Sequence, residues 1–347
     1  MSGHDHNFLS RFIHKIALQY PAVAEMSFDI ENALAIKRAD FPGNHVFISG
    51  LARSGTTILL NYLYQTGEFS SLTYADMPFV LMPNTWRKIS RRSAPASYRE
   101  RAHRDGLMIG PDSPEAFEEV FWRMFCGDNY IQDDRLLTHR VSAGLSEKFK
   151  AYIGNVLSTG TKGRRYLSKN NNDILRIDYL RTTFPDAYII VPFRDPLQQA
   201  ISLLNQHVHF CEIHKSDQFS LNYMNWLGHF EFGLNQKPFF LGDDDGFDKM
   251  QSYPKTDINF WLLTWKNYYS YLFEHLGDNL ILFNYDTFCA DPQSTLNRLF
   301  STIGVPDRGI AITPFKPVIK SIGGFDEVVL EECNTIYKRL LKDELLF

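Results

Sequence analysis

The sequence predicts an α/β fold with three layers, in which a parallel sheet is flanked by helices and helical insertions cover one edge. Short β-rich runs recur, each followed by a helical pattern, and this alternation is typical of a parallel sheet covered on both faces. A glycine-bearing loop joins the first strand to its helix, and two aromatic-rich stretches interrupt the alternation. The expected strands cover residues 45–50, 71–74, 164–169, 187–193 and 279–285.

Two of the expected helices have clear ends in the sequence. The first runs from Thr56 to about residue 65, carries apolar side chains at helical spacing, and is closed by Gly67. The second follows Asp195, an N-cap residue type, with Pro196 at the first helical position. A further amphipathic helix is expected near the N-terminus, with one apolar side made of Phe8, Phe12, Ile16 and Leu18.

The aromatic-rich stretches, at about residues 77–160 and 206–275, are predicted to be helical insertions within one domain that spans residues 1–347. The core of this domain is expected at about residues 41–76, 164–205 and 276–310. In the first insertion a helix is expected to begin at residues 112–115, and its apolar face is either core packing or a ligand-pocket wall. That face consists of Phe117, Val120, Phe121 and Met124.

Composition argues against several classes of function. A net charge of −4 provides no general basic field for nucleic acid or an anionic membrane, so locally placed Arg and Lys must bind any anionic ligand. The four cysteines are far apart and lack metal-ligand spacing, which favours a reduced, cytoplasmic location. The N-terminal stretch has neither a signal-peptide apolar region nor the ~20 apolar residues of a membrane span. The oligomeric state is left open.

The loop after the first expected strand has the features of an anion site. Successive backbone N–H groups of such a loop bind an anion, and the helix N-terminus adds partial positive charge. Its glycines have the spacing of the P-loop motif G-x-x-x-x-G-K-[ST], so the sheet is predicted to be P-loop-like. An ordinary structural turn is the alternative. The residues expected to bind phosphate are Gly50, Leu51, Ala52, Arg53, Ser54, Gly55, Thr56 and Thr57.

Thr56 stands where the P-loop motif requires a lysine. That lysine binds the β- and γ-phosphates of a nucleoside triphosphate, so its absence argues against ATP- or GTP-dependent phosphoryl transfer. The loop carries a cation at Arg53 instead. No metal site is expected, because the histidines form no H-E-x-x-H set and the acidic run at residues 243–246 lacks calcium-loop spacing.

A second anion site is predicted where the fourth expected strand ends. Arg194 stands at this end, and Ser202 follows eight residues later, about two helical turns on. Residues seven or eight apart share a helix face, so Ser202 can point back toward Arg194. Arginine with a hydroxyl is a compact site for one phosphate. The alternative is that Arg194 pairs with its neighbour Asp195.

Together these two elements resemble the sulfotransferases that use 3′-phosphoadenosine 5′-phosphosulfate (PAPS). The run R-S-G-T-T at residues 53–57 is similar to the family's 5′-phosphosulfate loop, and R-D-P-x5-S, from Arg194 to Ser202, is similar to its 3′-phosphate element. The likeness covers roughly residues 45–76 and 164–310, and it is closer to the membrane-type and bacterial enzymes than to the cytosolic ones. In place of the cytosolic R-K-G phosphate clamp, the chain has only Lys316, Lys320 and Gly323-Gly324.

The resemblance implies PAPS as the donor, no metal, and a hydroxyl or amine acceptor on a small molecule or carbohydrate held under the helical cap. Residues 53–57 would hold the 5′-phosphate and the sulfate, and Arg194 with Ser202 the 3′-phosphate. Lys169 would lie near the transferred sulfate. Fixed donors aimed at developing charge are the main catalytic resource, so Arg53 and Lys169 are expected to be catalytic. Two alternatives remain, a P-loop kinase or other nucleotide-binding protein and a non-catalytic nucleotide-sensing domain.

A general base is also expected, because the acceptor must lose a proton. Asp76 follows the second expected strand, about where the membrane-type and bacterial relatives place a catalytic glutamate. It is also interpretable as the cap of a helix beginning at Pro78. His103, Asp105 and His207 are further candidates, although His207 is also interpretable as a helix-end or core histidine.

Overall fold

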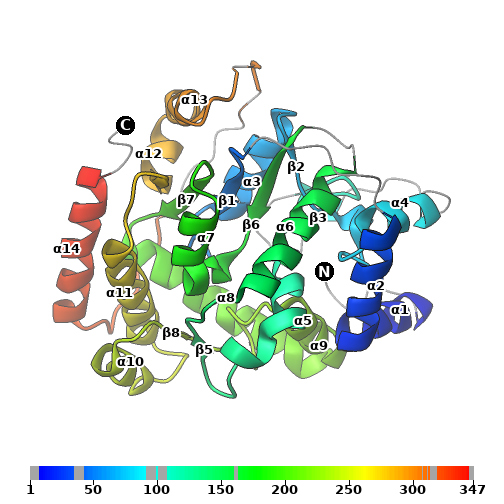
Figure 1. The fold of residues 1–347 in the computed structure, drawn as a ribbon. Coiled ribbons are helices and arrows are strands. Elements are labelled where there is room, and N and C mark those ends of the chain that lie inside the picture. The colour runs from blue at the N-terminus through cyan, green and yellow to red at the C-terminus, as the bar shows by residue number, and fades with distance from the viewer. Residues whose placement is uncertain are drawn as a thin grey trace.

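The central sheet has five parallel strands in the order β2-β6-β1-β7-β9 (Figure 1). The computed structural model describes residues 8–34, 43–90, 99–100, 108–159, 163–306, 308–310, 312 and 319–343. The strands of the sheet are β1 (Val46–Ile48), β2 (Phe69–Ser70), β6 (Arg165–Lys169), β7 (Tyr188–Phe193) and β9 (Leu280–Asn284). The predicted α/β fold with a parallel sheet is confirmed.

The position predicted for the second strand is wrong. This strand was expected at residues 71–74, but β2 ends at Ser70 and the chain then forms a 3-10 turn, Tyr74–Asp76. The turn is stabilised by pairing among its own polar groups and by hydrogen bonds to the chain at residues 111–113. The Thr73 amide donates to the Asp76 carboxylate at 2.7 Å, and the Asp76 amide donates to the Thr73 carbonyl at 3.0 Å.

Helices cover both faces of the sheet, as predicted. Successive strand residues point to opposite faces, so Val46 and Ile48 enter one hydrophobic cluster and Phe47 enters the other. The helices over the first face are α3 (Thr56–Gln65), α12 (Tyr285–Ala290) and α13 (Pro292–Thr302). Those over the second face include α6 (Ala143–Leu157), α7 (Ile177–Thr183) and α11 (Ile258–Glu274).

The central strand β1 brings the predicted functional segments together. Its last residue, Ile48, is paired with Lys169 of β6 on one side and with Ile190 of β7 on the other. The carboxyl ends of parallel strands therefore meet at one edge, which is where open α/β sheets bind ligands. The loop that starts at Gly50 and the corner at Arg194 both leave the sheet at this edge.

Both helices with clear sequence signals are confirmed. The helix α3 begins and ends at the predicted residues, Thr56 and Gln65. The helix α8 (Pro196–Ser216) follows Asp195, whose carboxylate accepts a hydrogen bond from the Gln198 amide at 2.9 Å. This contact is an N-cap, and it explains why the helix begins immediately after the Arg194 corner.

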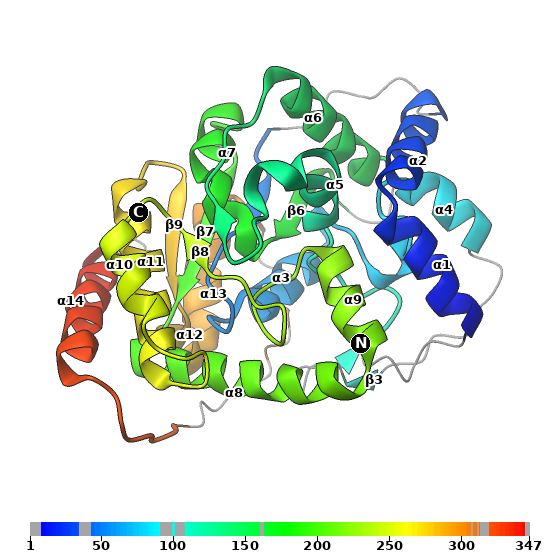
Figure 2. The ribbon, with the colours of Figure 1, turned by 90° about the horizontal axis from the view of Figure 1, so that it is seen from below.

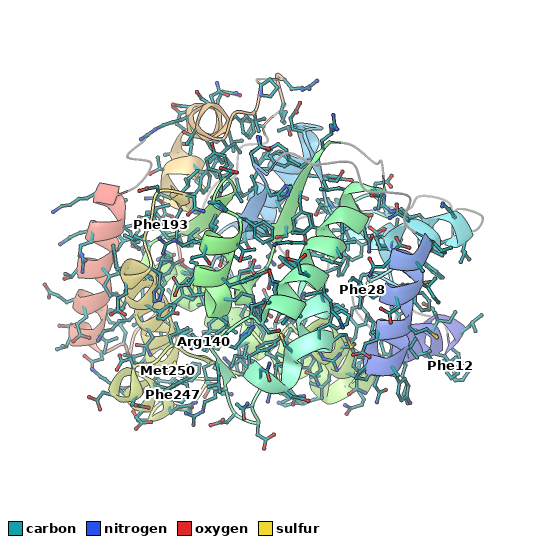
Figure 3. All side chains as sticks on the ribbon, in the orientation of Figure 1. Phe12, Phe28, Arg140, Phe193, Phe247 and Met250 are labelled. Atoms are coloured by element: carbon teal, nitrogen blue, oxygen red, sulfur yellow. The ribbon has the colours of Figure 1, made fainter. Side chains whose placement is uncertain are left out.

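The N-terminal helix α1 (Phe8–Gln19) is present, but its predicted apolar side is only partly buried. Phe8 and Phe12 are 88% and 51% exposed, and Phe12 lies on the outside of the molecule in Figure 3. Of the predicted side Leu18 is buried, together with His14, whose ring lies 5.7 Å from that of Tyr223. The contact surface of α1 is set by its packing on two neighbouring helices, α2 (Pro21–Leu34) and α9 (Gln218–Leu227).

The remaining helices lie around this core, with α1 and α2 on one side of the molecule and α14 on the opposite side in both views (Figures 1 and 2). Among the described residues, no helix is both long enough and apolar enough to cross a membrane. The helices that lie around the core, besides α1, are α2 (Pro21–Leu34), α4 (Pro83–Ser90), α5 (Glu119–Tyr130), α9 (Gln218–Leu227), α10 (Asp244–Gln251) and α14 (Glu327–Asp343).

In the first insertion, the helix expected from residue 112 begins only at Glu119, so its predicted start is wrong. The preceding segment is extended because it pairs with the chain after β2. There, the amide of Tyr74 donates to the Ser113 carbonyl at 3.2 Å, and that of Ala75 donates to the Pro111 carbonyl at 2.8 Å. The core interpretation of the apolar face is confirmed, since its residues are 0–7% exposed: Phe117, Val120, Phe121 and Met124.

A buried polar cluster ties the first insertion to the end of β6. Arg176 binds both oxygens of Glu119, at 2.8 and 3.1 Å, and the Asn170 amide group donates to the same carboxylate at 2.8 Å. The two charged side chains are 0% and 1% exposed. Burial alone would raise the pKa of Glu119, but the adjacent Arg176 charge and the hydrogen bonds hold that pKa below its ordinary value. Glu119 is therefore ionised.

Asp173 and Glu118 add two more carboxyl groups to this cluster. Asp173 Oδ1 accepts from Asn170 at 3.0 Å and from Arg176 at 3.4 Å, whereas no described residue donates to Oδ2. Burial, together with the negative charge of Glu118, raises the pKa of Asp173 well above its ordinary value. Both effects favour the protonated form of Asp173.

The variant Asp173→Asn tests this protonation, because the amide supplies the same acceptor and the same donor. A carboxyl group whose pKa is higher in the folded than in the unfolded protein stabilises the fold fully only below the pKa of the unfolded state, about 3.9. This stabilisation is lost as the pH rises toward the pKa of the folded state. Urea unfolding between pH 5 and pH 8 should show the variant gaining stability relative to wild type as pH increases.

The matched control is Asp248→Asn, which alters an exposed carboxylate on α10. Its stability difference from wild type should stay nearly constant over the same pH range. An Asp173→Asn difference that is equally constant would show that Asp173 is ionised in the folded protein.

Candidate functional site

The loop between β1 and α3 depends on two residues with positive φ, Arg53 at 70° and Gly55 at 94°. The Ser54 amide and hydroxyl both donate to the Leu51 carbonyl, at 3.3 and 2.7 Å, and close the turn. A Cβ atom at Gly55 would collide with the ring of Tyr285. Glycine is required at this position by its conformation and by the space around it.

Gln199 on α8 fixes the carbonyl side of this loop. It is fully buried, and its Nε2 donates to the carbonyls of Leu51 at 3.3 Å and Ala52 at 3.0 Å. The C=O and the following N–H of a trans peptide point in opposite directions, so the next amides face away from Gln199. Within the described chain, the amides of Ala52, Gly55 and Thr56 donate to no backbone carbonyl outside the helix. Such an arrangement of amides is suited to an anion.

The two predicted anion sites touch each other. Arg53 Nε donates to Ser202 Oγ at 3.1 Å. Ser202 lies on α8 about two turns beyond Arg194, and its hydroxyl accepts from Arg53 of the loop, whereas the spacing predicted that it points toward Arg194. The loop after β1 and the corner after β7 therefore contribute to one polar surface.

Arg194 packs against an aromatic ring and keeps an unused donor. Its guanidinium carbon lies 5.0 Å from the centre of the Tyr285 ring, and its buried Nε has no hydrogen-bond acceptor among the described residues. Asp195 is engaged elsewhere, because its carboxylate caps α8 and its amide donates to Asp286 at 2.6 Å. A buried donor without an acceptor is costly, which makes this position favourable for an anionic ligand.

Lys169 adds a third basic side chain at the same sheet edge. It is the last residue of β6, only 8% exposed, and paired in register with Ile48. The next amide, that of Asn170, donates to the Ile48 carbonyl at 2.9 Å, so the strand pairing continues past Lys169. This pairing fixes the backbone of Lys169 beside the start of the anion-binding loop.

Asp76, a predicted general base, is fully buried and bound by Arg87. Arg87 donates to its two oxygens at 2.5 and 2.6 Å. No helix begins at Pro78, since α4 starts at Pro83, so that part of the capping interpretation is wrong. Asp76 instead closes its own 3-10 turn through the contacts with Thr73.

The other predicted base residues do not join this surface in the described part of the chain. His207 is buried, its ring centre lies 5.3 Å from that of Trp261 in a tilted arrangement, and its Nε2 lies 3.5 Å from Cys211 Sγ. Burial lowers the pKa of His207 to about 4, which agrees with the core-histidine interpretation. The residues that lie outside the described ranges are His103, Asp105 and Lys316.

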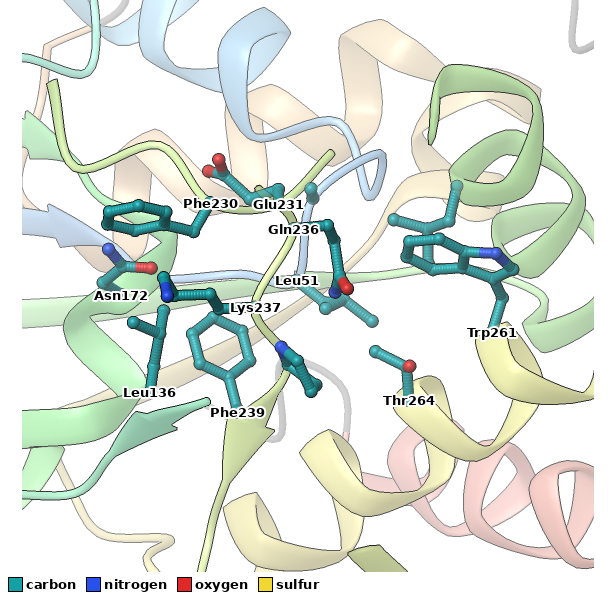
Figure 4. Close-up of a pocket in the computed structure, with 13 residues that line it drawn as sticks. Leu51, Leu136, Asn172, Phe230, Glu231, Gln236, Lys237, Phe239, Trp261 and Thr264 are labelled. Atoms are coloured by element: carbon teal, nitrogen blue, oxygen red, sulfur yellow. The ribbon is translucent and has the colours of Figure 1, made fainter. Parts of the chain in front are cut away.

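A pocket opens beside the loop, at Leu51 and Ala52 (Figure 4). Its enclosed space is about 20 Å³, and it lies where β5 (Leu136–Leu137) and β8 (Phe239–Phe240) pair the two insertions with each other. Figure 4 shows Asn172 and Phe230 on one side of it and Trp261 on the other. The insertions thus form a cap over the sheet edge that carries the anion site.

Several residues of this site were missed by sequence reasoning. Gln199 lies in a helical run without a motif, and Tyr285 is only the last residue of an expected strand, 279–285. Glu231 and Asn172, which line the pocket, belong to no motif with a known spacing. A signal was available only for Gly55, whose place in the motif indicated a constrained backbone but not the ring that constrains it.

Comparison with known proteins places this geometry in a family. The model of the "Sulfotransferase family" matches residues 45–231, more than half of the chain. The chain is similar to the solved sulfotransferase STF9 from Mycobacterium avium, with 17% identity, a TM-score of 0.46, and coverage of 95% of this chain and 76% of that one. It is also similar to sulfotransferase STF1 from Mycobacterium tuberculosis H37Rv, with 14% identity, a TM-score of 0.44, and coverage of 98% of this chain and 83% of that one. No curated protein matches the chain.

The family match includes the loop at residues 50–57, Lys169, Arg194 and Ser202. These are the residues that the sheet edge brings together. The chain belongs to the sulfotransferase family.

Proposed function

We propose that the protein transfers a sulfuryl group from PAPS to a hydroxyl or amine acceptor. The observation that supports this most is the contact between Arg53 and Ser202, because it joins a loop suited to one phosphate to an arginine and hydroxyl suited to another. PAPS carries a 5′-phosphosulfate and a separate 3′-phosphate. A nucleoside triphosphate carries its phosphates in a single chain and would have no group for Arg194.

The roles of the basic residues follow from where charge develops. During transfer, negative charge grows on the oxygen that links the sulfate to the 5′-phosphate, and fixed donors aimed at that oxygen lower the barrier. We assign this role to the loop amides, Arg53 and Lys169. We assign Arg194 and Ser202 to the 3′-phosphate. Asp76 and His103 stay predictions for the general base, and Asp76 could act only if Arg87 released one of its oxygens.

The proposal is tested by thermal unfolding and label transfer. Adenosine 3′,5′-bisphosphate should raise the melting temperature more than ATP with Mg²⁺ does, because a ligand that binds only the folded state stabilises it. Labelled PAPS should pass its sulfate to an acceptor in the presence of EDTA. Stabilisation by ATP with Mg²⁺ alone would favour a kinase. Stabilisation by the bisphosphate without transfer to any acceptor would favour a nucleotide-sensing domain.

The variant Arg194→Ala tests the 3′-phosphate site. A lost hydrogen bond to a charged group costs about 1.5–3 kcal/mol, so the affinity for adenosine 3′,5′-bisphosphate should fall about 10- to 150-fold. The affinity for adenosine 5′-phosphate, which lacks the 3′-phosphate, should change little. Isothermal titration with both ligands measures the difference, and equal losses would remove Arg194 from this site.

The variant Gly55→Ala tests the loop, with Gly67→Ala as its control. Both glycines have positive φ, but a Cβ at Gly67 meets nothing within 4 Å, whereas at Gly55 it meets the Tyr285 ring. Both variants should lose about 1 kcal/mol of stability from backbone strain, and Gly55→Ala should lose more because its Cβ displaces the Tyr285 ring. Only Gly55→Ala should also weaken binding of adenosine 3′,5′-bisphosphate. Normal binding by Gly55→Ala would show that the loop does not contact the nucleotide.

A further inference from the structure

We propose that Glu231 is the general base, and that the pocket beside the loop binds a small, uncharged alcohol or phenol with an apolar body. This inference rests on the proposed function. It assigns to the pocket a substrate class and to Glu231 a role that no sequence motif indicated.

The position of Glu231 is fixed by the strand that carries Lys169. Asn171, two residues beyond Lys169, donates from Nδ2 to Glu231 Oε1 at 2.7 Å. Glu231 lines the same pocket as Leu51, a residue of the anion-binding loop. A carboxylate, a basic side chain and the loop therefore meet at the carboxyl ends of β6 and β1.

Glu231 differs from Asp76 and Glu119 because one of its carboxylate oxygens accepts no hydrogen bond from a described residue. Within the described residues, no donor contacts its Oε2 and no Arg or Lys forms an ion pair with it. Asp76 is bound through two oxygens by Arg87, and Glu119 in the same way by Arg176. A guanidinium stabilises the ionised form and weakens a carboxylate as a base. Glu231 therefore has an oxygen that can accept a proton from a bound acceptor.

The polar groups inside the pocket are hydrogen-bond acceptors. Asn172 and Gln236 are 2% and 5% exposed, and no described residue donates to Asn172 Oδ1 or Gln236 Oε1. The orientation of Asn172 is set by its Nδ2, which donates to the Gly228 carbonyl at 3.1 Å. In Figure 4 the Asn172 oxygen lies toward the other lining residues. Acceptor oxygens beside a carboxylate favour a ligand that brings O–H donors and disfavour an anionic one.

The walls of the pocket favour an apolar body. Phe230, Phe239 and Trp261 supply aromatic surface. Lys237 contributes its aliphatic stem, because its ammonium group donates to the carbonyls of Gln132 and Asp133 at 2.7 and 2.5 Å. The enclosed space is about 20 Å³, room for about one water, so the lining side chains must move apart when an acceptor binds.

The chemical step then balances without a further reactant. The acceptor O–H proton passes to the Glu231 carboxylate while the acceptor oxygen forms a bond to sulfur. The bond between sulfur and the 5′-phosphate oxygen breaks, and its electron pair leaves with adenosine 3′,5′-bisphosphate. The loop amides, Arg53 and Lys169 face the charge on that leaving oxygen.

The test uses labelled PAPS, the full chain, and 2-naphthol as the neutral acceptor. Glu231→Gln keeps the oxygen that Asn171 binds but removes the basic carboxylate, so the single-turnover rate should fall about 10²- to 10⁴-fold. Its melting temperature and its affinity for adenosine 3′,5′-bisphosphate should match those of wild type.

The control Glu212→Gln changes an exposed carboxylate that pairs with Lys215 on α8, and it should behave as wild type throughout. Full activity in Glu231→Gln would overturn the base assignment, and loss of activity in a stably folded Asp76→Asn would return that role to Asp76. The acceptor class would be overturned if the wild type transferred sulfate to an anionic oligosaccharide but not to 2-naphthol. It would also be overturned if the wild type bound the bisphosphate but transferred sulfate to neither acceptor. Failure to bind the bisphosphate would instead overturn the proposed function.

Discussion

The buried ion pair between Glu119 and Arg176 is the interaction on which the site depends. It joins the first insertion to the segment after β6, and Asn170 is bonded to the same carboxylate. Removing charges from water is expensive, and the expense is offset only where geometry and hydrogen bonds are nearly complete. Two oxygens of Glu119 bound by one guanidinium meet that condition. Lys169 and Asn171, the residues on either side of Asn170, are consequently held in one position.

A second constraint acts on the anion-binding loop. Gln199 holds two of its carbonyls from one side, and the Tyr285 ring packs against Gly55 from the other. The same ring lies against Arg194, so one aromatic side chain contacts both parts of this polar surface. Donors held in place before a ligand arrives need no reorganisation when charge develops, which is the main advantage of such a loop in catalysis.

Around the sheet edge the polar groups are divided by type. Basic side chains and amides come from the loop, Lys169 and Arg194, whereas the pocket contributes the acceptor oxygens of Glu231 and Asn172. A reaction between an anionic donor molecule and a proton-bearing acceptor needs both kinds of group, a short distance apart. The net charge of −4 does not reveal this division, because net charge is a sum over the whole chain.

By itself the sequence determined the parallel sheet, the limits of α3 and the start of α8. These depend on local features, namely periodicity, an N-cap and a glycine spacing, that neighbouring residues settle among themselves. Only the tertiary structure decided that Asp76 lies against Arg87, and that Glu231 is bound by Asn171, which is 60 residues away in the chain. It also decided which side of α1 is buried. Contacts between distant residues follow from how whole elements pack, and no local pattern records that packing.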